Sequence, residues 1–121
     1  MNIDYIKLQE SEWNTLFNIE TKSDEILIVQ IAELVIDEIN YESGKLIFEK
    51  PKREWAMFWN EKKEDWENHI DTDSPIGNKI TAFNAKIVGD TISISLGGNH
   101  SLGFSRWGFY VDRMKFQPKE N

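Results

Sequence analysis

The apolar residues between positions 53 and 70 recur at the spacing of an α-helix, which makes this stretch the best helix candidate in the chain. On a helical projection, one stripe collects the side chains of Trp55, Phe58, Trp59, Lys62, Trp66 and Ile70. The opposite side collects the carboxylates of Glu54, Glu61, Glu64 and Asp65. A pattern with this period is typical of a helix that packs on a core, so we predict a long amphipathic helix over about residues 53–70.

Two short elements are predicted at the start of the chain. Ile3–Leu8 alternates weakly between apolar and polar positions, which predicts a first strand. Ser11 can then cap a short helix, whose apolar face would be formed by Trp13, Leu16 and Phe17 at positions i, i+3 and i+4.

Residues 24–33 have apolar positions at helical spacing, although their β-branched content favours a strand. We predict a helix there, followed by a hairpin formed by residues 34–41 and 45–49. Gly44 would occupy the turn of this hairpin, because glycine readily adopts a positive φ. A single helix that continues to Asn40 is the alternative.

The pattern of residues in the last third of the chain predicts strands. Lys79–Val88 and Thr91–Leu96 flank Gly89-Asp90, which is a two-residue hairpin turn. Residues 97–100, Gly-Gly-Asn-His, predict another turn, and residues 102–116 then return as one long aromatic strand. We therefore expect an α+β fold, with a mostly antiparallel sheet packed against the long helix and one or two shorter N-terminal helices.

Length and composition predict a single domain over residues 1–121, because 121 residues suffice for one core and no linker is visible. The chain has no cysteine, and its N-terminal residues show no basic region followed by an apolar one. We therefore expect a soluble, cytoplasmic protein without a membrane span. The net charge of −7 disfavours binding to nucleic acid or anionic lipid and favours basic partners.

Few residues are available for catalysis or metal binding. His69 lies close in sequence to Asp71 and Asp73, but a calcium loop starting at Asp71 would have Ile76 in place of the required glycine. His100 lies in the glycine-rich segment, which lacks the glycine spacing and lysine of a phosphate-binding loop. We therefore expect no metal, no cofactor and no enzymatic activity. A small hydrolase or ligand-binding domain that uses these two regions is the alternative.

The tryptophans fall into two groups. Trp55, Trp59 and Trp66 would pack in the core beneath the predicted helix, whereas Trp107 stands in a crowded aromatic strand next to Tyr110, part of which can be exposed at a binding surface.

In size, acidity, lack of cysteine and tryptophan content, the whole chain resembles the immunity proteins of bacterial toxin systems, although it carries no motif that assigns individual residues. The resemblance implies an inhibitor that covers the active or substrate-binding surface of a basic, nuclease-like toxin. Acidic and aromatic side chains are the candidates for partner binding. They are Glu54, Glu61, Glu64, Asp65, Trp107 and Tyr110.

Overall fold

The computed structural model describes residues 3–68 and 75–119, and within these ranges the chain consists almost entirely of β-strands. The described helix, α1, spans Tyr5–Gln9. The strands are β1 (Thr15–Lys22), β2 (Ile26–Ile31), β3 (Leu34–Ile36), β4 (Ile39–Tyr41), β5 (Gly44–Glu49), β6 (Lys52–Asn60), β7 (Asp65–Asn68), β8 (Lys79–Ile80), β9 (Ala82–Val88), β10 (Thr91–His100), β11 (Gly103–Val111) and β12 (Arg113–Pro118). The predicted α+β class is therefore wrong. No helix in the described ranges has the length and apolar character needed to cross a membrane.

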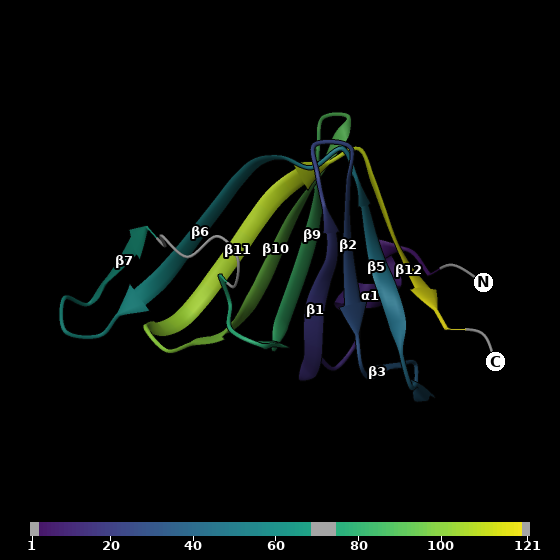
Figure 1. Cartoon of the computed structure of the whole chain (residues 1–121), viewed down its shortest axis with the longest axis horizontal. Helices are drawn as coiled ribbons and strands as arrows, with labels where there is room; N and C mark the ends of the chain where they lie inside the picture. Colours follow the sequence, from purple (N-terminus) through teal and green to yellow (C-terminus); the bar gives the residue numbers. More distant parts are fainter. Residues whose placement is uncertain (1–2, 69–74, 120–121) are drawn as a thin grey trace.

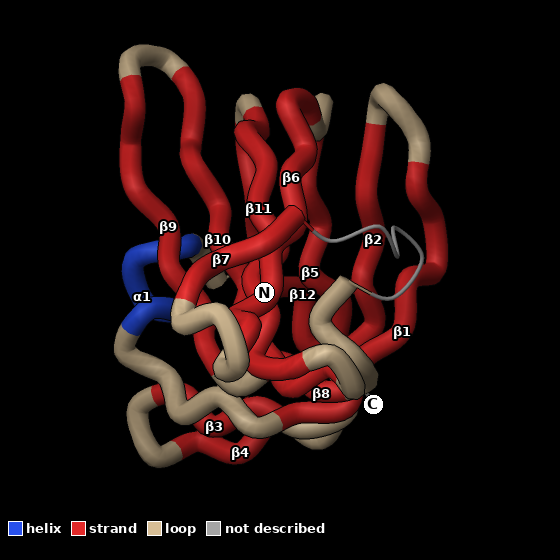
Figure 2. Tube along the Cα trace, turned by 90° about the vertical axis from the view of Figure 1, so that its left-hand side faces the viewer, coloured by secondary structure: helices blue, strands red, loops and turns tan. Residues whose placement is uncertain are grey.

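Two five-stranded sheets contain most of the strands. Sheet 1 has the order β12-β5-β2-β1-β8, and sheet 2 has the order β7-β6-β11-β10-β9. The chain passes from one sheet to the other between β5 and β6, between β7 and β8, between β8 and β9, and between β11 and β12. The two sheets come together at the top of Figure 1 and spread apart below. In Figure 2, β7 crosses in front of the other strands of sheet 2.

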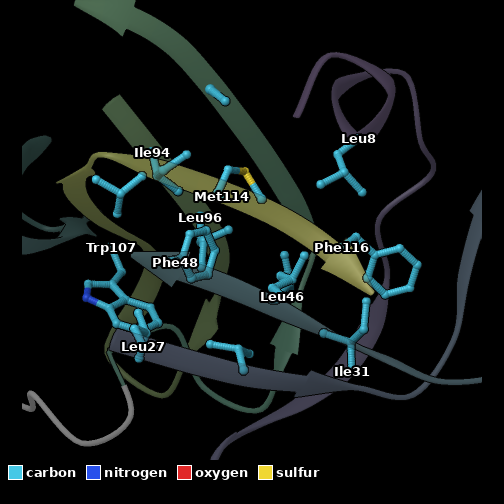
Figure 3. Close-up of a cluster of buried hydrophobic side chains, with 14 of the residues drawn as sticks. Leu8, Leu27, Ile31, Leu46, Phe48, Ile94, Leu96, Trp107, Met114 and Phe116 are labelled. Atoms are coloured by element: carbon cyan, nitrogen blue, oxygen red, sulfur yellow. The ribbon is translucent and has the colours of Figure 1, made fainter. Parts of the chain in front are cut away.

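The core lies between the sheets and collects the inward-facing residues of both. Its largest fully buried side chains include Trp107, Phe48, Phe109 and Phe116. Phe109 contacts the rings of both Trp107 and Phe48 edge-on, with centroids 5.2 and 5.0 Å away. Figure 3 shows Trp107 at one end of the buried cluster and Phe116 at the other. Edge-to-face contacts of this kind add to the free energy gained from burial.

The long helix predicted over residues 53–70 is wrong, because β6 and β7 form a hairpin there. In β6, Ala56 and Phe58 face the inside of the curled sheet, while Trp55, Met57 and Trp59 face the outside, as their pairing with β11 shows. Because apolar side chains lie on both sides, the strand loses the alternation that would identify it in the sequence. Bulky aromatic residues nevertheless favour a pleated strand.

Asn60 ends β6 and starts the turn that replaces the middle of the predicted helix. Its side-chain Oδ1 accepts hydrogen bonds from the backbone N–H groups of Lys62 (3.1 Å) and Lys63 (3.3 Å). Glu64 has a φ of 51° and completes the reversal. An asparagine that bonds to the backbone two residues later favours a turn, so the charged run after Asn60 is a hairpin loop.

The helix predicted over residues 24–33 is also wrong, because this stretch contains β2. Inward-facing residues of β2 are buried, and outward-facing ones such as Ile26 and Ile28 are half-buried. Apolar residues again lie on both faces and hide the alternation. The β-branched content, which favours a strand, was the better guide here.

The hairpin predicted for residues 34–41 and 45–49 has a different pairing. β3 turns back at once on β4 through Asp37 and Glu38, whose φ values are 51° and 67°. Two consecutive positive φ values are typical of a tight two-residue hairpin turn. Gly44 begins β5, which pairs with β2 and β12 instead.

The first two predicted elements are exchanged. The strand predicted over residues 3–8 is wrong, because most of this stretch belongs to α1, whose N-cap is Asp4. The Asp4 Oδ1 accepts hydrogen bonds from the backbone N–H groups of Ile6 and Lys7, as expected for a helix cap. The helix predicted after Ser11 is instead β1, which alternates between half-buried and exposed residues.

In the last third of the chain, the structure agrees more closely with the elements predicted from the sequence. The hairpin at Gly89 is confirmed, with β9 and β10 paired on either side. The turn predicted at residues 97–100 is wrong, because these residues continue β10. A Cβ on Gly98 would lie 2.4 Å from two backbone oxygens, so glycine is needed there for close approach of the chain. The strand predicted over residues 102–116 divides at Asp112, where the chain changes sheets.

Candidate functional site: the aromatic face of sheet 2

The outward side of sheet 2 carries large aromatic side chains contributed by three adjacent strands. Because paired residues point to the same side of a sheet, the register of β6, β7 and β11 places these residues together. We call this surface the aromatic face, and its residues are Trp55, Met57, Trp59, Trp66, Phe104, Arg106 and Tyr110. Trp55 is 36% exposed and Phe104 is 40% exposed, so the face is in contact with solvent.

Two glycines let aromatic rings lie directly on the sheet. A Cβ on Gly108 would come within 2.2 Å of the six-membered ring of Trp55, which shows that this indole rests on the glycine backbone. A Cβ on Gly97 would lie 3.1 Å from the Phe104 ring. A side chain at either position would lift the ring from the sheet. The glycines therefore fix the height of both aromatic groups above the backbone.

The rest of the aromatic face is held by contacts between rings. Trp59 and Trp66 lie opposite each other on β6 and β7, with centroids 5.6 Å apart and planes inclined by 69°. The ring of Trp66 also contacts that of Phe104, with centroids 6.4 Å apart. Three rings from three strands thus form a continuous edge-to-face row, which both stiffens the sheet and presents a rigid apolar surface.

The charged side chains at the outward positions of the described strands of sheet 2 are cations. Arg106 donates hydrogen bonds from Nε (3.3 Å) and Nη2 (3.0 Å) to the hydroxyl of Ser95 on β10. Arg53 lies in the bulge of β6 with a φ of 55°, and its guanidinium carbon is 5.9 Å from the centroid of the Tyr110 ring. Lys86 is exposed on β9 and has the same orientation as Ser93, its partner on β10.

Carboxylates are absent from the outward positions of the described strands of sheet 2. Asp65 and Glu67 on β7 pair with Asn60 and Phe58, which places them on the opposite side of the sheet from Trp66. Asp112 lies beyond the end of β11 and forms an ion pair of 2.8 Å with Lys52. The aromatic face is therefore locally cationic in a chain whose net charge is −7.

Trp107, a predicted binding residue, lies in the core with 0% exposure. Its indole Nε1–H donates a 2.9 Å hydrogen bond to Oε1 of Glu54, another predicted binding residue. Glu54 also forms a 2.8 Å ion pair with Lys22, whose Nζ is 5.8 Å from the Trp107 ring. The mouth between the sheets holds a pocket of about 300 Å³ at this point, lined partly by these three side chains. The carboxylate thus satisfies a buried indole donor.

The other predicted binding residues do not form one surface. Glu61 and Glu64 lie in the loop between β6 and β7, and the carboxylate of Asp65 accepts a 2.8 Å hydrogen bond from the N–H of Trp66. Tyr110 lies on the aromatic face. The helical face that would have grouped these carboxylates does not exist. In addition, the three tryptophans expected in the core lie on the outside of sheet 2.

Negative charge is instead concentrated at the end of the molecule formed by α1, the chain that follows it, and the β3–β4 hairpin. These segments are in contact through a bridge between Glu12 and Val35 and an ion pair between Lys7 and Asp37. Lys7 also donates a hydrogen bond to Asp37 within this ion pair, and that hydrogen bond raises the pKa of Lys7. We call the surface the acidic end, and its exposed carboxylates are Asp4, Glu10, Glu12, Glu33, Asp37, Glu38 and Glu42.

The segments around the two histidines were the candidates for catalysis or metal binding. His69, Asp71 and Asp73 lie outside the described residues. His100 ends β10, and its ring Nδ1 accepts a 3.1 Å hydrogen bond from the N–H of Leu102. The described part of the chain contains no group of three or more acidic, histidine or cysteine residues with a metal-binding arrangement.

Met57, Phe104, Arg53 and Arg106 were not identified from the sequence as parts of a site. A pattern in residues 104–110 could have identified part of the aromatic face. When the segment is taken as a strand, Phe104, Arg106 and Tyr110 point to the same side. The chain matches no protein-family model, no curated protein and no solved structure in the comparisons made with each.

Proposed function

We propose that the chain is a non-catalytic protein-binding domain and that the aromatic face contacts the partner. The observation that carries this proposal is the composition of the face. Interfaces between proteins are enriched in Trp, Tyr, Phe, Met and Arg and depleted of Asp, Glu and Lys, and the face follows this bias closely. Trp, Tyr and Arg are also the residues that contribute most binding energy when a partner buries them.

The rigidity of the face supports the same proposal. The Trp55 ring rests on a glycine, and Trp59 and Trp66 hold each other through an edge-to-face contact. Side chains fixed in this way lose little rotamer freedom on binding, so more of the contact free energy remains as affinity. A cytoplasmic location belongs to this proposal, since the absence of cysteine fits a reducing compartment.

The test compares capture of a partner by three forms of the immobilised chain. The face variant carries Trp55→Asp and Phe104→Asp, which place carboxylates on two partly exposed rings. The control variant carries Leu16→Asp and Ile87→Asp, which make the same chemical change at residues that are 50% and 61% exposed outside the face. Circular dichroism establishes that both variants remain folded.

The wild-type chain and the control are expected to retain the same protein from an extract of the native source. The face variant should lose it, because a buried, unpaired carboxylate opposes complex formation. Equal retention by both variants would show that the aromatic face does not contact the partner.

A second candidate function is inhibition of a basic, nuclease-like toxin, with contact made by the acidic end. Its support is the seven exposed carboxylates of the acidic end, of which Asp37 forms an ion pair with Lys7. Such a surface attracts cationic partners and speeds their association at low ionic strength. Changing Glu33, Glu38 and Glu42 to Gln would slow association with such a toxin, whereas the face variant would not.

A further inference from the structure

We propose that the partner of the aromatic face is an acidic protein surface, one that presents carboxylates among apolar side chains. This inference rests on the proposed function and names the chemistry of the partner at that site. It runs against the net charge of the chain, which by itself favours basic partners.

The first argument is local charge complementarity. The outward-facing charged groups on the described strands of sheet 2 are Lys52, Arg53, Lys86 and Arg106, and Lys52 is paired with Asp112. Asp65 and Glu67 of β7 lie on the other side of the sheet. Screening at physiological salt reduces interactions between exposed charges beyond about 8 Å. A partner docked on the face therefore responds to these nearby cations more than to carboxylates elsewhere on the molecule.

The second argument is the geometry of Arg106. It lies between Phe104 and Gly108 on the same side of β11, and therefore between the two rings that rest on the sheet. Ser95 accepts from its Nε and Nη2 atoms and fixes the guanidinium plane. A guanidinium has five N–H donors, so three remain for a ligand in this arrangement. A fixed guanidinium with paired donors is suited to two-point recognition of a carboxylate.

The third argument separates a protein from a nucleic acid as the polyanion. Affinity for nucleic acid depends on neutralising many phosphates with cations, whereas the described strands of sheet 2 present few outward cations, and one of them, Lys52, is already paired with Asp112. A protein that presents a few carboxylates needs only these few cations. Apolar side chains between its carboxylates would cover Trp55, Trp59 and Trp66.

The experiment uses three probes with the full chain: a short peptide that alternates Glu with Leu and Phe, the same peptide with every Glu replaced by Lys, and single-stranded oligothymidine. Binding is followed in NMR spectra from the indole N–H signals of Trp55, Trp59 and Trp66. Arg106→Gln is the test variant. Arg113→Gln is its control, since Arg113 is an exposed arginine on β12 of sheet 1.

The acidic peptide should shift the three indole signals. It should also bind about tenfold more tightly than the basic peptide, because the basic peptide cannot form a charge-assisted hydrogen bond with Arg106. Arg106→Gln should remove most of that difference, and Arg113→Gln should leave it unchanged. Equal or tighter binding of the basic peptide, no binding of either peptide, or preferential binding of oligothymidine would overturn the inference. Capture of a protein that still depends on Trp55 and Phe104 would leave the proposed function intact in each case.

Discussion

The exchange of roles between Trp107 and Trp59 gives a stability prediction that tests the strand register directly. Trp107 is fully buried between the sheets, while Trp59 is half-buried on the outside of sheet 2. A helix over residues 53–70 would reverse this order, with Trp59 at the centre of the core. Alanine substitutions at the two positions therefore distinguish the two folds.

The magnitudes follow from burial. A buried tryptophan removes about 150–250 Å² from water, and substitution of such a residue by alanine typically costs about 3–5 kcal/mol. Trp107→Ala also removes the indole donor to Glu54, which keeps its ion pair with Lys22. Trp59→Ala loses one aromatic pair, worth about 0.5–1.5 kcal/mol, and part of its burial. We expect it to cost about 2 kcal/mol less than Trp107→Ala.

The assay is equilibrium unfolding in urea followed by far-ultraviolet circular dichroism. With a slope of about 2 kcal/mol per molar urea, a loss of about 4 kcal/mol lowers the midpoint by about 2 M. Because small domains have a stability of about 5–15 kcal/mol, Trp107→Ala would be close to unfolding without denaturant. Trp107→Phe serves as a milder variant if the alanine protein does not fold. A larger loss for Trp59→Ala than for Trp107→Ala would refute the reasoning.

Three further predictions follow from particular contacts. Gly98→Ala should lower the free energy of unfolding by about 1–3 kcal/mol because its Cβ would overlap backbone oxygens, and an unchanged melting temperature would contradict that close approach. Gly108→Ala should lift the Trp55 ring and shift its indole N–H signal in NMR spectra, whereas an unmoved signal would place the ring elsewhere. The hydrogen bond from Lys63 lowers the pKa of Glu67, so this carboxylate stabilises the fold above its unfolded pKa, and the contribution is lost as pH falls through the folded value. Glu67→Gln should therefore flatten the decline in stability measured below about pH 5.

The sequence predicted strands correctly where one face of a strand is apolar and the other polar. In β10, Ile94 and Leu96 are buried and alternate with serines, and Gly89 marks the turn before the strand. Prediction failed where both faces are apolar, as in β6, where Trp55 and Trp59 lie outside while Phe58 lies inside. A helical period fits residues 55–59 by chance, because all five are apolar.

The candidate site was predictable only in part. Tyr110 was identified from its aromatic neighbours, and it lies on the aromatic face. Trp107 was chosen on the same grounds but points inward, because residues three apart in a strand, like adjacent residues, face opposite sides of the sheet. Arg53 joins Tyr110 through a bulge with a positive φ, which residue spacing cannot reveal.

Hydroxyl-radical footprinting of the chain, alone and bound to its captured partner, tests the proposed interface most directly. Oxidation rates of Trp55, Met57 and Phe104 should fall severalfold in the complex, because a protein docked on the aromatic face excludes solvent from them. Oxidation of Tyr41 and Ile39, at the acidic end, should be unchanged. Protection of Tyr41 and Ile39 with continued oxidation of Trp55 and Phe104 would contradict the proposed interface and place the partner on the acidic end.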